Sequence, residues 1–501
     1  MKTTRSLQLA ALLALSSGSL LSAATYSLHI TGPTSYRASA TNAIANVLTN
    51  PVASYSGTNL SLSTTATFTG TIGADTWNIY TYWTGSENAV RATAQASTPY
   101  PTFPFLALSN PQSVVIKATA PLVVSGGTSI ASPVFDNARP EATLSDAYQA
   151  STQYKGTKAG VTYNALVGPT IPGLPPTVIA VQPYEIIASA RDSAGNSYTP
   201  ATYTGKLTTT AGSLNATLSA AIPGLKDGAI IDNPNLRAVT AIQSINGKNV
   251  VLSQPALVSG KAIASSFEYN GLSNLSSQLA RKTFQTGSAK LSQYTGSNAD
   301  AGVTVYAIGR SHDAGARAGF VLEAGLDKPG TSVTSLQQYY PLDIDGNVIG
   351  LPGAGTTIAD VELVPSEKVN GVVYTVGQSG YSSGTLLTKP FLATNGLANS
   401  LFISYIGVSD ANTAVEKGNA QKVAYNGFYY TAPAVQQGQY TLWDYEHIYY
   451  LSSIPAKLKG TVNLIAKQIA VSDGAVAGVL IDANFKAVRT PVAIDGAIVT
   501  R

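Results

Sequence analysis

One stretch near the N-terminus indicates the fold class most clearly: WNIYTYWTGSENAVRA (residues 77–92). Trp77–Trp83 alternates apolar and polar side chains, which is typical of a half-buried β-strand. The turn at residues 84–86 then leads into Glu87–Ala92, which begins as a helix with Ser86 as the expected N-cap and an acidic first turn. A strand, a Gly/Ser/Thr turn and a helix start in this order indicate an α/β protein.

The same order of elements occurs twice more. A turn at Thr31–Ser35 follows a strand at Tyr26–Ile30, and a polar loop at Arg310–Arg317 joins a buried strand at Val303–Gly309 to a helix at Ala318–Ala324. Helix N-termini present unpaired N–H groups and a positive dipole end, so such turns form an anion site when they converge. Any α/β protein also needs caps at these joints, and spacing alone does not separate the two interpretations.

Composition excludes several classes of protein. The chain has 501 residues, no cysteine, one methionine and three histidines, and only 11% of its residues are charged. Without cysteine there is no disulfide scaffold, thiolate metal site, cysteine nucleophile or acylated lipoprotein anchor. A typical soluble domain has about 25% charged residues. The low charge and the many Ser, Thr, Gly and Tyr residues indicate an exported, strand-rich protein.

The first 24 residues are predicted to be a signal peptide. Lys2 and Arg5 precede the apolar stretch Leu7–Leu15, and small residues at Ser22–Ala24 suit cleavage. We therefore expect a periplasmic or extracellular protein without a lipid anchor.

The rest of the chain argues against two kinds of partner. No later segment approaches the ~18–20 apolar residues that span a bilayer, so no membrane insertion is expected. Lys and Arg do not cluster, so nucleic acid is not expected either. We expect a monomer that uses no cofactor and no metal.

Length predicts more than one lobe, because single cores stop growing near ~250–300 residues. A Pro/Gly-rich segment at Gly160–Pro183 indicates a crossing between lobes. We expect lobe 1 at residues 25–170 and 435–501, lobe 2 at 171–434, and a β-rich insertion at about 190–270 within lobe 2.

Four motifs, in chain order, carry a resemblance to a known family: Thr31–Arg37, Trp83–Glu87, Leu144–Gln149 and Gly309–Arg317. Together they resemble the phosphate-binding proteins of ABC transporters, and most closely a divergent exported branch of that family. The resemblance extends over most of residues 26–450. It implies a two-lobed type 2 periplasmic-binding-protein fold of class α/β, phosphate or a related oxyanion between the lobes, an ABC permease as partner and no enzymatic activity.

The resemblance also implies roles for individual residues. The implied ligand-binding residues are Thr34, Ser35, Ser86, Asp146, Arg310, Gly315 and Arg317. A carboxylate at Asp146 would accept the proton of hydrogen phosphate and disfavour sulfate, which carries none; a helix N-cap is the alternative role for Asp146. Ala314 and Ala316 stand where the family has hydroxyl residues, so two donors to the anion are missing.

Two other functions remain open. A β-rich surface or adhesion protein on the same scaffold would suit the low charge and the Thr-rich strands. A serine hydrolase could use Ser382 of the Gly380–Gly384 motif with His447 and Asp444. The segment Asp343–Asn347 favours a hairpin turn over a calcium loop, because its glycine comes too early and no closing glutamate follows.

Overall fold

The computed structural model describes residues 23–326, 336–369, 372–490 and 497–500. The predicted signal peptide falls on residues 1–24, so all of it except Ala23 and Ala24 lies outside the described residues. Among the described residues, no helix is both long enough and apolar enough to cross a membrane.

A 16-stranded mixed sheet runs through the main body of the molecule. Its main path is β22 (Ser288–Lys290), β23 (Thr304–Ala307), β30 (Ser400–Gly407), β14 (Val178–Ser189), β32 (Trp443–Leu451), β10 (Ala142–Ser145), β1 (Thr25–Pro33), β4 (Asp75–Thr84), β3 (Thr65–Ile72), β2 (Thr49–Tyr55), β6 (Ser113–Ile116) and β7 (Ser125–Gly126). Four strands pair beside this path: β8 (Thr128–Ser129), β13 (Leu166–Val167), β21 (Asn274–Leu275) and β31 (Ala420–Tyr425).

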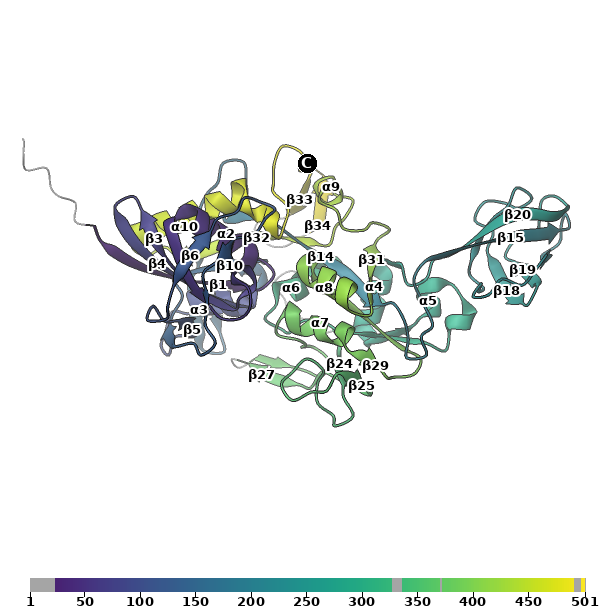
Figure 1. Ribbon diagram of the computed structural model, residues 1–501, viewed down its shortest axis with the longest axis horizontal. Helices are drawn as coiled ribbons and strands as arrows, with labels where there is room; N and C mark the ends of the chain where they lie inside the picture. Colours follow the sequence, from purple (N-terminus) through teal and green to yellow (C-terminus); the bar gives the residue numbers. More distant parts are fainter. Residues whose placement is uncertain (1–22, 327–335, 370–371, 491–496, 501) are drawn as a thin grey trace, which may run out of the picture.

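Two hydrophobic cores divide this sheet into two lobes (Figure 1). In lobe 1, the helices α2 (Arg37–Val47) and α10 (Ala456–Val471) pack together over one face of β1, β3 and β4. In lobe 2, α4 (Ser277–Thr286) and α6 (Gly315–Glu323) pack against β23 and β30. Strands β14 and β32 contribute to both cores, so they form the link between the lobes.

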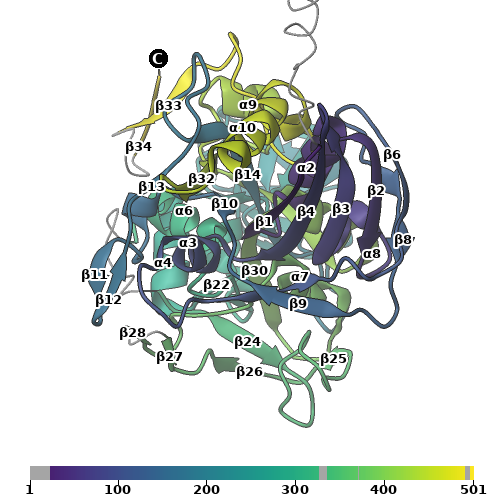
Figure 2. The same cartoon turned by 90° about the vertical axis from the view of Figure 1, so that its left-hand side faces the viewer.

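Side-chain alternation in β1 explains how lobe 1 buries both faces of its sheet. Leu28 and Ile30 point into the core beneath α2, whereas His29 stacks on Tyr80 on the other face. The helix α3 (Ser86–Ala94) packs on that second face (Figure 2). A sheet covered by helices on both faces is the arrangement expected of an α/β domain.

The insertion in lobe 2 is a separate six-stranded antiparallel sheet. Its strand order is β17 (Ile230–Asp232), β20 (Gly260–Tyr269), β15 (Ala201–Thr209), β16 (Asn215–Leu218), β19 (Asn249–Leu252) and β18 (Ile242–Asn246). This sheet has its own core, which includes Leu207 and Phe267, and it projects away from both lobes (Figure 1). We call residues 201–269 the arm. The predicted fold class, α/β with a β-rich insertion, is confirmed.

The remaining elements are short. The helices are α5 (Ser292–Thr295), α7 (Gly384–Leu392), α8 (Val408–Lys417) and α9 (Ala432–Gln436), with 3-10 turns at Leu60–Leu62, Gln149–Ser151, Asn298–Asp300 and Asp473–Val476. The two-stranded pairs are β5 (Phe103–Leu106) with β9 (Phe135–Ala138), β11 (Gly156–Lys158) with β12 (Val161–Tyr163), β24 (Tyr339–Leu342) with β26 (Asp360–Leu363), β25 (Thr357–Ile358) with β29 (Thr394–Asn395), β27 (Glu367–Val369) with β28 (Val372–Tyr374), and β33 (Ala487–Thr490) with β34 (Ala497–Thr500).

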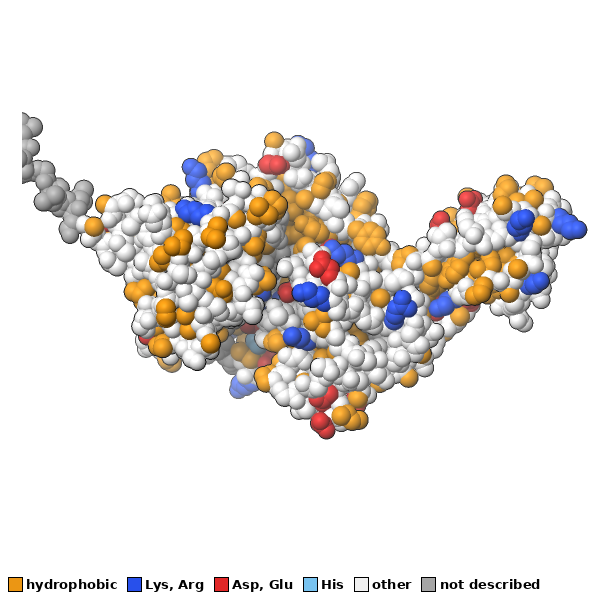
Figure 3. Space-filling view, viewed as in Figure 1, with side chains coloured by type: hydrophobic (Ala, Val, Ile, Leu, Met, Phe, Trp, Pro, Cys, Tyr) orange, Lys and Arg blue, Asp and Glu red, His pale blue; other side chains and the backbone are white. Residues whose placement is uncertain are grey.

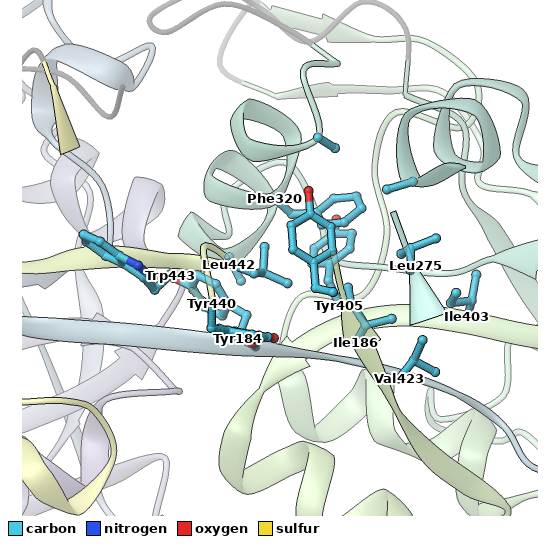
Figure 4. Close-up of a cluster of buried hydrophobic side chains, with 14 of the residues drawn as sticks. Tyr184, Ile186, Leu275, Phe320, Ile403, Tyr405, Val423, Tyr440, Leu442 and Trp443 are labelled. Atoms are coloured by element: carbon cyan, nitrogen blue, oxygen red, sulfur yellow. Dashed lines mark hydrogen bonds between the residues drawn. The ribbon is translucent and has the colours of Figure 1, made fainter. Parts of the chain in front are cut away.

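Aromatic side chains fill the core of lobe 2 (Figure 4). Phe320 of α6 lies flat on Tyr405 of β30, with ring centroids 4.2 Å apart and an angle of 11° between the ring planes. Phe284 of α4 meets Phe320 edge-on at 4.6 Å. These contacts fix α6, and therefore the loop that precedes it, against the sheet.

Replacing Phe320 with alanine should destabilise the protein by about 3–5 kcal/mol, because it leaves a cavity between α6 and the sheet. Urea unfolding of the mature protein measures the change. The control is Ile344→Ala, a side chain that is 86% exposed and should cost no more than about 0.5 kcal/mol. Equal losses in the two variants would contradict this account of the core.

Candidate functional site

Three of the predicted ligand residues lie together because their strands are neighbours. Strand β1 pairs in parallel with β4 on one side and with β10 on the other. Thr34, Ser86 and Asp146 each follow the carboxyl end of one of these strands. In open α/β sheets, ligands bind at the carboxyl ends of parallel strands.

Lobe 2 presents a matching pair of strand ends. Strands β23 and β30 are parallel neighbours; Arg310 follows β23, and the turn into α8 follows β30. Sequence analysis missed this second turn, Gly407–Asp410. Its signal was present, because a continuous apolar strand followed by Gly-Val-Ser-Asp at a helix start repeats the pattern found after β4.

A cavity of about 240 Å³ lies where the two sets of turns face each other. Thr34, Ser35 and Arg37 line it from lobe 1, and Gly407, Ser409 and Asp410 line it from lobe 2. Gln182 of β14 lines it from the link between the lobes. Figure 3 shows the surface hollowed between these lobes. Pockets for drug-sized molecules measure about 300–1,000 Å³, so this cavity suits a small ligand.

The cavity wall is rich in unpaired hydrogen-bond donors. Helices α2 and α8 both begin there, with Tyr36 and Gly407 as N-caps, and neither N-cap forms a side-chain capping bond. Within the described residues, Thr34 Oγ1 and Arg37 Nε are buried and have no hydrogen-bond partner. Buried donors normally have partners, so these atoms mark a place where a ligand would be held.

One carboxyl group faces these donors. Burial raises the pKa of Asp410, and the positive charges of Arg37 and Arg310 act to lower it. Burial lowers the pKa of Arg37, and Asp410 acts against that shift. Arg37 and Asp410 form no ion pair with each other, although both line the cavity. The cavity therefore combines a cation, two helix N-termini and one carboxyl group.

Asp146 is not among the residues that line the cavity, and its carboxyl group is already bound by the protein. Ser86 Oγ donates a hydrogen bond to Oδ1, and the Tyr184 hydroxyl donates to Oδ2 at 2.8 Å. The backbone at Gly315 lies so close to this carboxyl group that no side chain would fit at position 315. Burial raises the pKa of Asp146, while hydrogen bonds from Ser86 and Tyr184 and the charge of Arg310 act to lower it.

Two predicted capping roles are wrong. Gly85, not Ser86, is the N-cap of α3, because Ser86 already has helical geometry and its hydroxyl turns to Asp146. Asp146 caps no helix either, since the next helical turn begins after Tyr148. The predicted loop Arg310–Arg317 is also too long, because α6 already begins at Gly315.

The first turn of α3 binds the loop after β23 directly. Glu87 N donates to the carbonyl of Asp313 at 3.0 Å, so lobe 1 and lobe 2 share a backbone hydrogen bond. Burial raises the pKa of the Glu87 side chain to about 8; Arg317 acts to lower this pKa, whereas Asp313 and Asp146 raise it further. A buried carboxyl group with such a pKa holds its proton at neutral pH.

Arg310 is anchored to backbone rather than to an acid. Its Nε and Nη2 donate to the carbonyls of Tyr381 and Ser382 at 3.2 and 3.1 Å. Its charge nevertheless acts on both Asp146 and Asp410, so it influences the two neighbouring carboxyl groups at once. Arg317 donates from Nη2 to the carbonyl of Gln378 at 2.8 Å.

The seven predicted ligand residues thus occupy two adjoining places. Thr34 and Ser35 line the cavity, and Ser86, Asp146 and Gly315 are packed against one another. Arg310 acts on the carboxyl groups of both places, and Arg317 acts on Glu87. Ala314 and Ala316, which replace hydroxyl residues of the resembling family, are buried.

The hydrolase motif does not assemble a triad. His447 is buried, and its Nδ1 lies 2.9 Å from Thr177 Oγ1 rather than near Ser382. Burial lowers the pKa of His447 to about 3, which makes it a poor general base. Ser382 instead lies beside His312 in a second cavity on lobe 2, with no hydrogen bond between the two side chains among the described contacts.

The predicted turn at Asp343–Asn347 agrees with the hydrogen bonding. Asp343 accepts hydrogen bonds from the backbone N–H groups of Asp345, Asn347 and Gly355, as a turn residue does. The described part of the chain contains no group of three or more side chains suited to a metal ion. Most aromatic residues of the C-terminal strand region are buried (Tyr440, Trp443, Tyr445, Tyr449 and Tyr450), whereas Tyr429 is 48% exposed.

Comparison with known proteins gives remote structural neighbours only. No protein-family model matches the chain, and neither does the sequence of any curated protein. A protein from Clostridium perfringens, described as a phosphate ABC transporter substrate-binding protein with bound phosphate, has a TM-score of 0.37 and 10% identity over 91% of this chain and 100% of its own. An ABC-type phosphate transport receptor from Vibrio cholerae has a TM-score of 0.26 and 10% identity over 59% of this chain and 80% of its own.

A third neighbour is PstS from Borrelia burgdorferi, with a TM-score of 0.24 and 13% identity over 58% of this chain and 74% of its own. At TM-scores this low, the structural likeness assigns no function to this chain.

Replacing Glu87 with glutamine should flatten the pH dependence of stability. The folded-state pKa of about 8 lies above the ordinary 4.5, so the contribution of Glu87 is complete below 4.5 and is lost as pH rises toward 8. We expect Glu87→Gln to gain stability relative to the wild type between pH 5 and pH 8.5. Urea unfolding at several pH values gives this difference directly.

The matched control is Glu362→Gln, because Glu362 is an exposed acid on strand β26 of lobe 2. The stability of this variant should change with pH as that of the wild type does. A Glu87→Gln profile parallel to the wild type would show that Glu87 is ionised in the folded protein.

Proposed function

We propose that this chain is an exported solute-binding protein that holds a small oxyanion, with phosphate as the best fit, in the cavity between α2 and α8. One observation carries the proposal: two uncapped helix N-termini from different lobes meet at Arg37, where Thr34 Oγ1 and Arg37 Nε have no partner among the described residues. No covalent chemistry is proposed.

The expected binding energy comes mainly from Arg37. A hydrogen bond between ionised groups contributes about 1.5–3 kcal/mol, and each helix N-terminus adds about 0.3–1 kcal/mol. Thr34 adds a hydroxyl donor, and Arg310 adds positive potential through its effect on Asp410. Because these groups come from both lobes, an anion would hold the lobes together.

Asp410 favours an anion that carries a proton. A carboxylate beside an anion is repulsive unless the anion donates a hydrogen bond to it, as hydrogen phosphate can and sulfate cannot at neutral pH. The role that the resemblance gave to Asp146 therefore fits Asp410 better, because both oxygens of Asp146 already accept hydrogen bonds from Ser86 and Tyr184.

The wider role follows from the sequence. The predicted signal peptide and the resemblance to phosphate-binding proteins support a periplasmic or extracellular monomer that delivers its anion to an ABC permease. In this proposal, Ser86, Asp146 and Gly315 join the lobes beside the ligand, and Arg317 supports Glu87 at that contact.

Calorimetric titration of the mature protein with phosphate tests the proposal. Arg37→Gln should weaken phosphate binding by about 10- to 100-fold, because a charge-assisted bond is lost. Lys248→Gln removes the same charge from the arm and should leave affinity unchanged. If the wild type gives no heat with either phosphate or sulfate, the proposal is wrong.

Selectivity tests the role of Asp410 separately. Asp410→Asn should lower the ratio of phosphate to sulfate affinity, since the amide no longer repels an anion without a proton. Asp146→Asn is the comparison variant and should leave this ratio close to that of the wild type. A larger change in Asp146→Asn than in Asp410→Asn would move the ligand to Asp146.

A further inference from the structure

The far end of the arm is formed by three loops that hydrogen bonds tie together. Strand β15 runs outward from Ala201, and its last residue, Thr209, pairs with Gly260 at the start of β20. Beyond that pair, Ala256 N donates to the carbonyl of Ser213 at 3.0 Å, and Leu257 N donates to the carbonyl of Asn235 at 2.9 Å. We call residues 210–214, 233–238 and 254–262 the arm tip.

The base of the arm is attached to lobe 2 by side chains. The Tyr269 hydroxyl donates to Asp300 Oδ2 at 2.7 Å, and Lys226 Nζ lies 3.2 Å from Asp300 Oδ1. The arm tip is thus at the end away from lobe 2 and from the anion cavity (Figure 1). A partner bound at the tip would leave the cavity accessible.

Three aliphatic side chains are exposed on the arm tip. Leu214 is 42% exposed, Leu257 51% and Val258 52%.

The charges on the arm tip have one sign. Arg237 and Lys261 are exposed on the same loops, and the three segments contain no Asp or Glu. Figure 3 shows cationic and apolar side chains at the far end of the arm. Neither cation forms an ion pair among the described residues, so both charges are available to a partner.

An exposed apolar strip on lobe 1 provides a contrast. Val114 and Ile116 of β6 are also exposed, but the neighbouring Lys117 turns its ammonium group to the carbonyl of Leu48 at 2.5 Å. That strip therefore lacks a free cation, whereas the arm tip combines aliphatic side chains with two.

We infer that the arm tip is a peripheral binding surface for an anionic lipid bilayer. Aliphatic side chains bind the boundary between headgroups and acyl chains, and nearby Lys and Arg side chains are attracted to anionic headgroups. The tip segments themselves contain no carboxylate; the exposed Asp232 directly precedes one of them. The protein docks on the membrane by its arm without spanning it.

Sedimentation with vesicles tests this inference on the mature protein. We expect binding to phosphatidylcholine vesicles that contain phosphatidylglycerol, weaker binding at high salt, and little binding to phosphatidylcholine alone. The double variant Arg237→Gln/Lys261→Gln should bind about 25-fold more weakly, since each cation near an anionic surface contributes about fivefold.

A second double variant, Leu257→Ser/Val258→Ser, should weaken binding without changing charge. The control, Lys206→Gln/Lys248→Gln, removes the same charge from the arm outside the tip and should bind like the wild type. Circular dichroism checks that each variant is folded. Because the assay measures vesicle binding alone, its outcome does not depend on whether phosphate binds.

Three results would overturn the inference. The first is no binding to anionic vesicles, and the second is an equal loss in the Lys206/Lys248 control. The third is concentration-dependent self-association that the Leu257/Val258 variant abolishes, because the tip would then be a contact between copies of the chain.

Discussion

The contact between Gly315 and Asp146 determines how close the two lobes can come. Position 315 has no room for a side chain, so the start of α6 rests directly on the carboxyl group of Asp146. That carboxyl group is held in turn by Ser86 at the start of α3 and by Tyr184 on β14. One carboxyl group therefore joins lobe 1, lobe 2 and the strand that links them.

Much of this arrangement could be predicted from the sequence, because it depends on local signals. The turn at residues 84–86 and the loop after Val303–Gly309 were identified from strand–turn–helix order, and both reach the boundary between the lobes. Residues after parallel strands gather at one sheet edge, so Thr34, Ser86 and Asp146 lie near one another once β1, β4 and β10 pair.

The features of the site that the sequence did not predict depend on contacts between residues that are distant along the chain. The local sequence pattern does not distinguish Asp410 from Asp146, since either residue follows an apolar strand. The difference arises from Tyr184, which binds Asp146 and lies on a strand that crosses between lobes. Likewise, Ser86 fits the pattern of an N-cap, and only the presence of Asp146 beside it turns its hydroxyl away from α3.

Burial of acids at the lobe boundary is unusual in a chain with so few charges. Glu87, Asp146, Asp410 and Glu446 all have a raised pKa, and in each case burial is the largest cause. A buried carboxyl group that keeps its proton avoids the cost of an unpaired charge and can still donate a hydrogen bond.

The two places at the boundary also differ in how their polar groups are satisfied. The carboxyl group of Asp146 accepts a hydrogen bond from Ser86 at the start of α3, and it lies against Gly315 at the start of α6. Both helix N-termini therefore have an acidic partner within the chain. Around the cavity, Asp410 lies in the first turn of α8, but Thr34 Oγ1 and Arg37 Nε have no hydrogen-bond partner among the described residues. The same turn chemistry therefore produces a structural contact in one place and a candidate anion site in the other, and the difference is whether the polar atoms there already have hydrogen-bond partners within the protein.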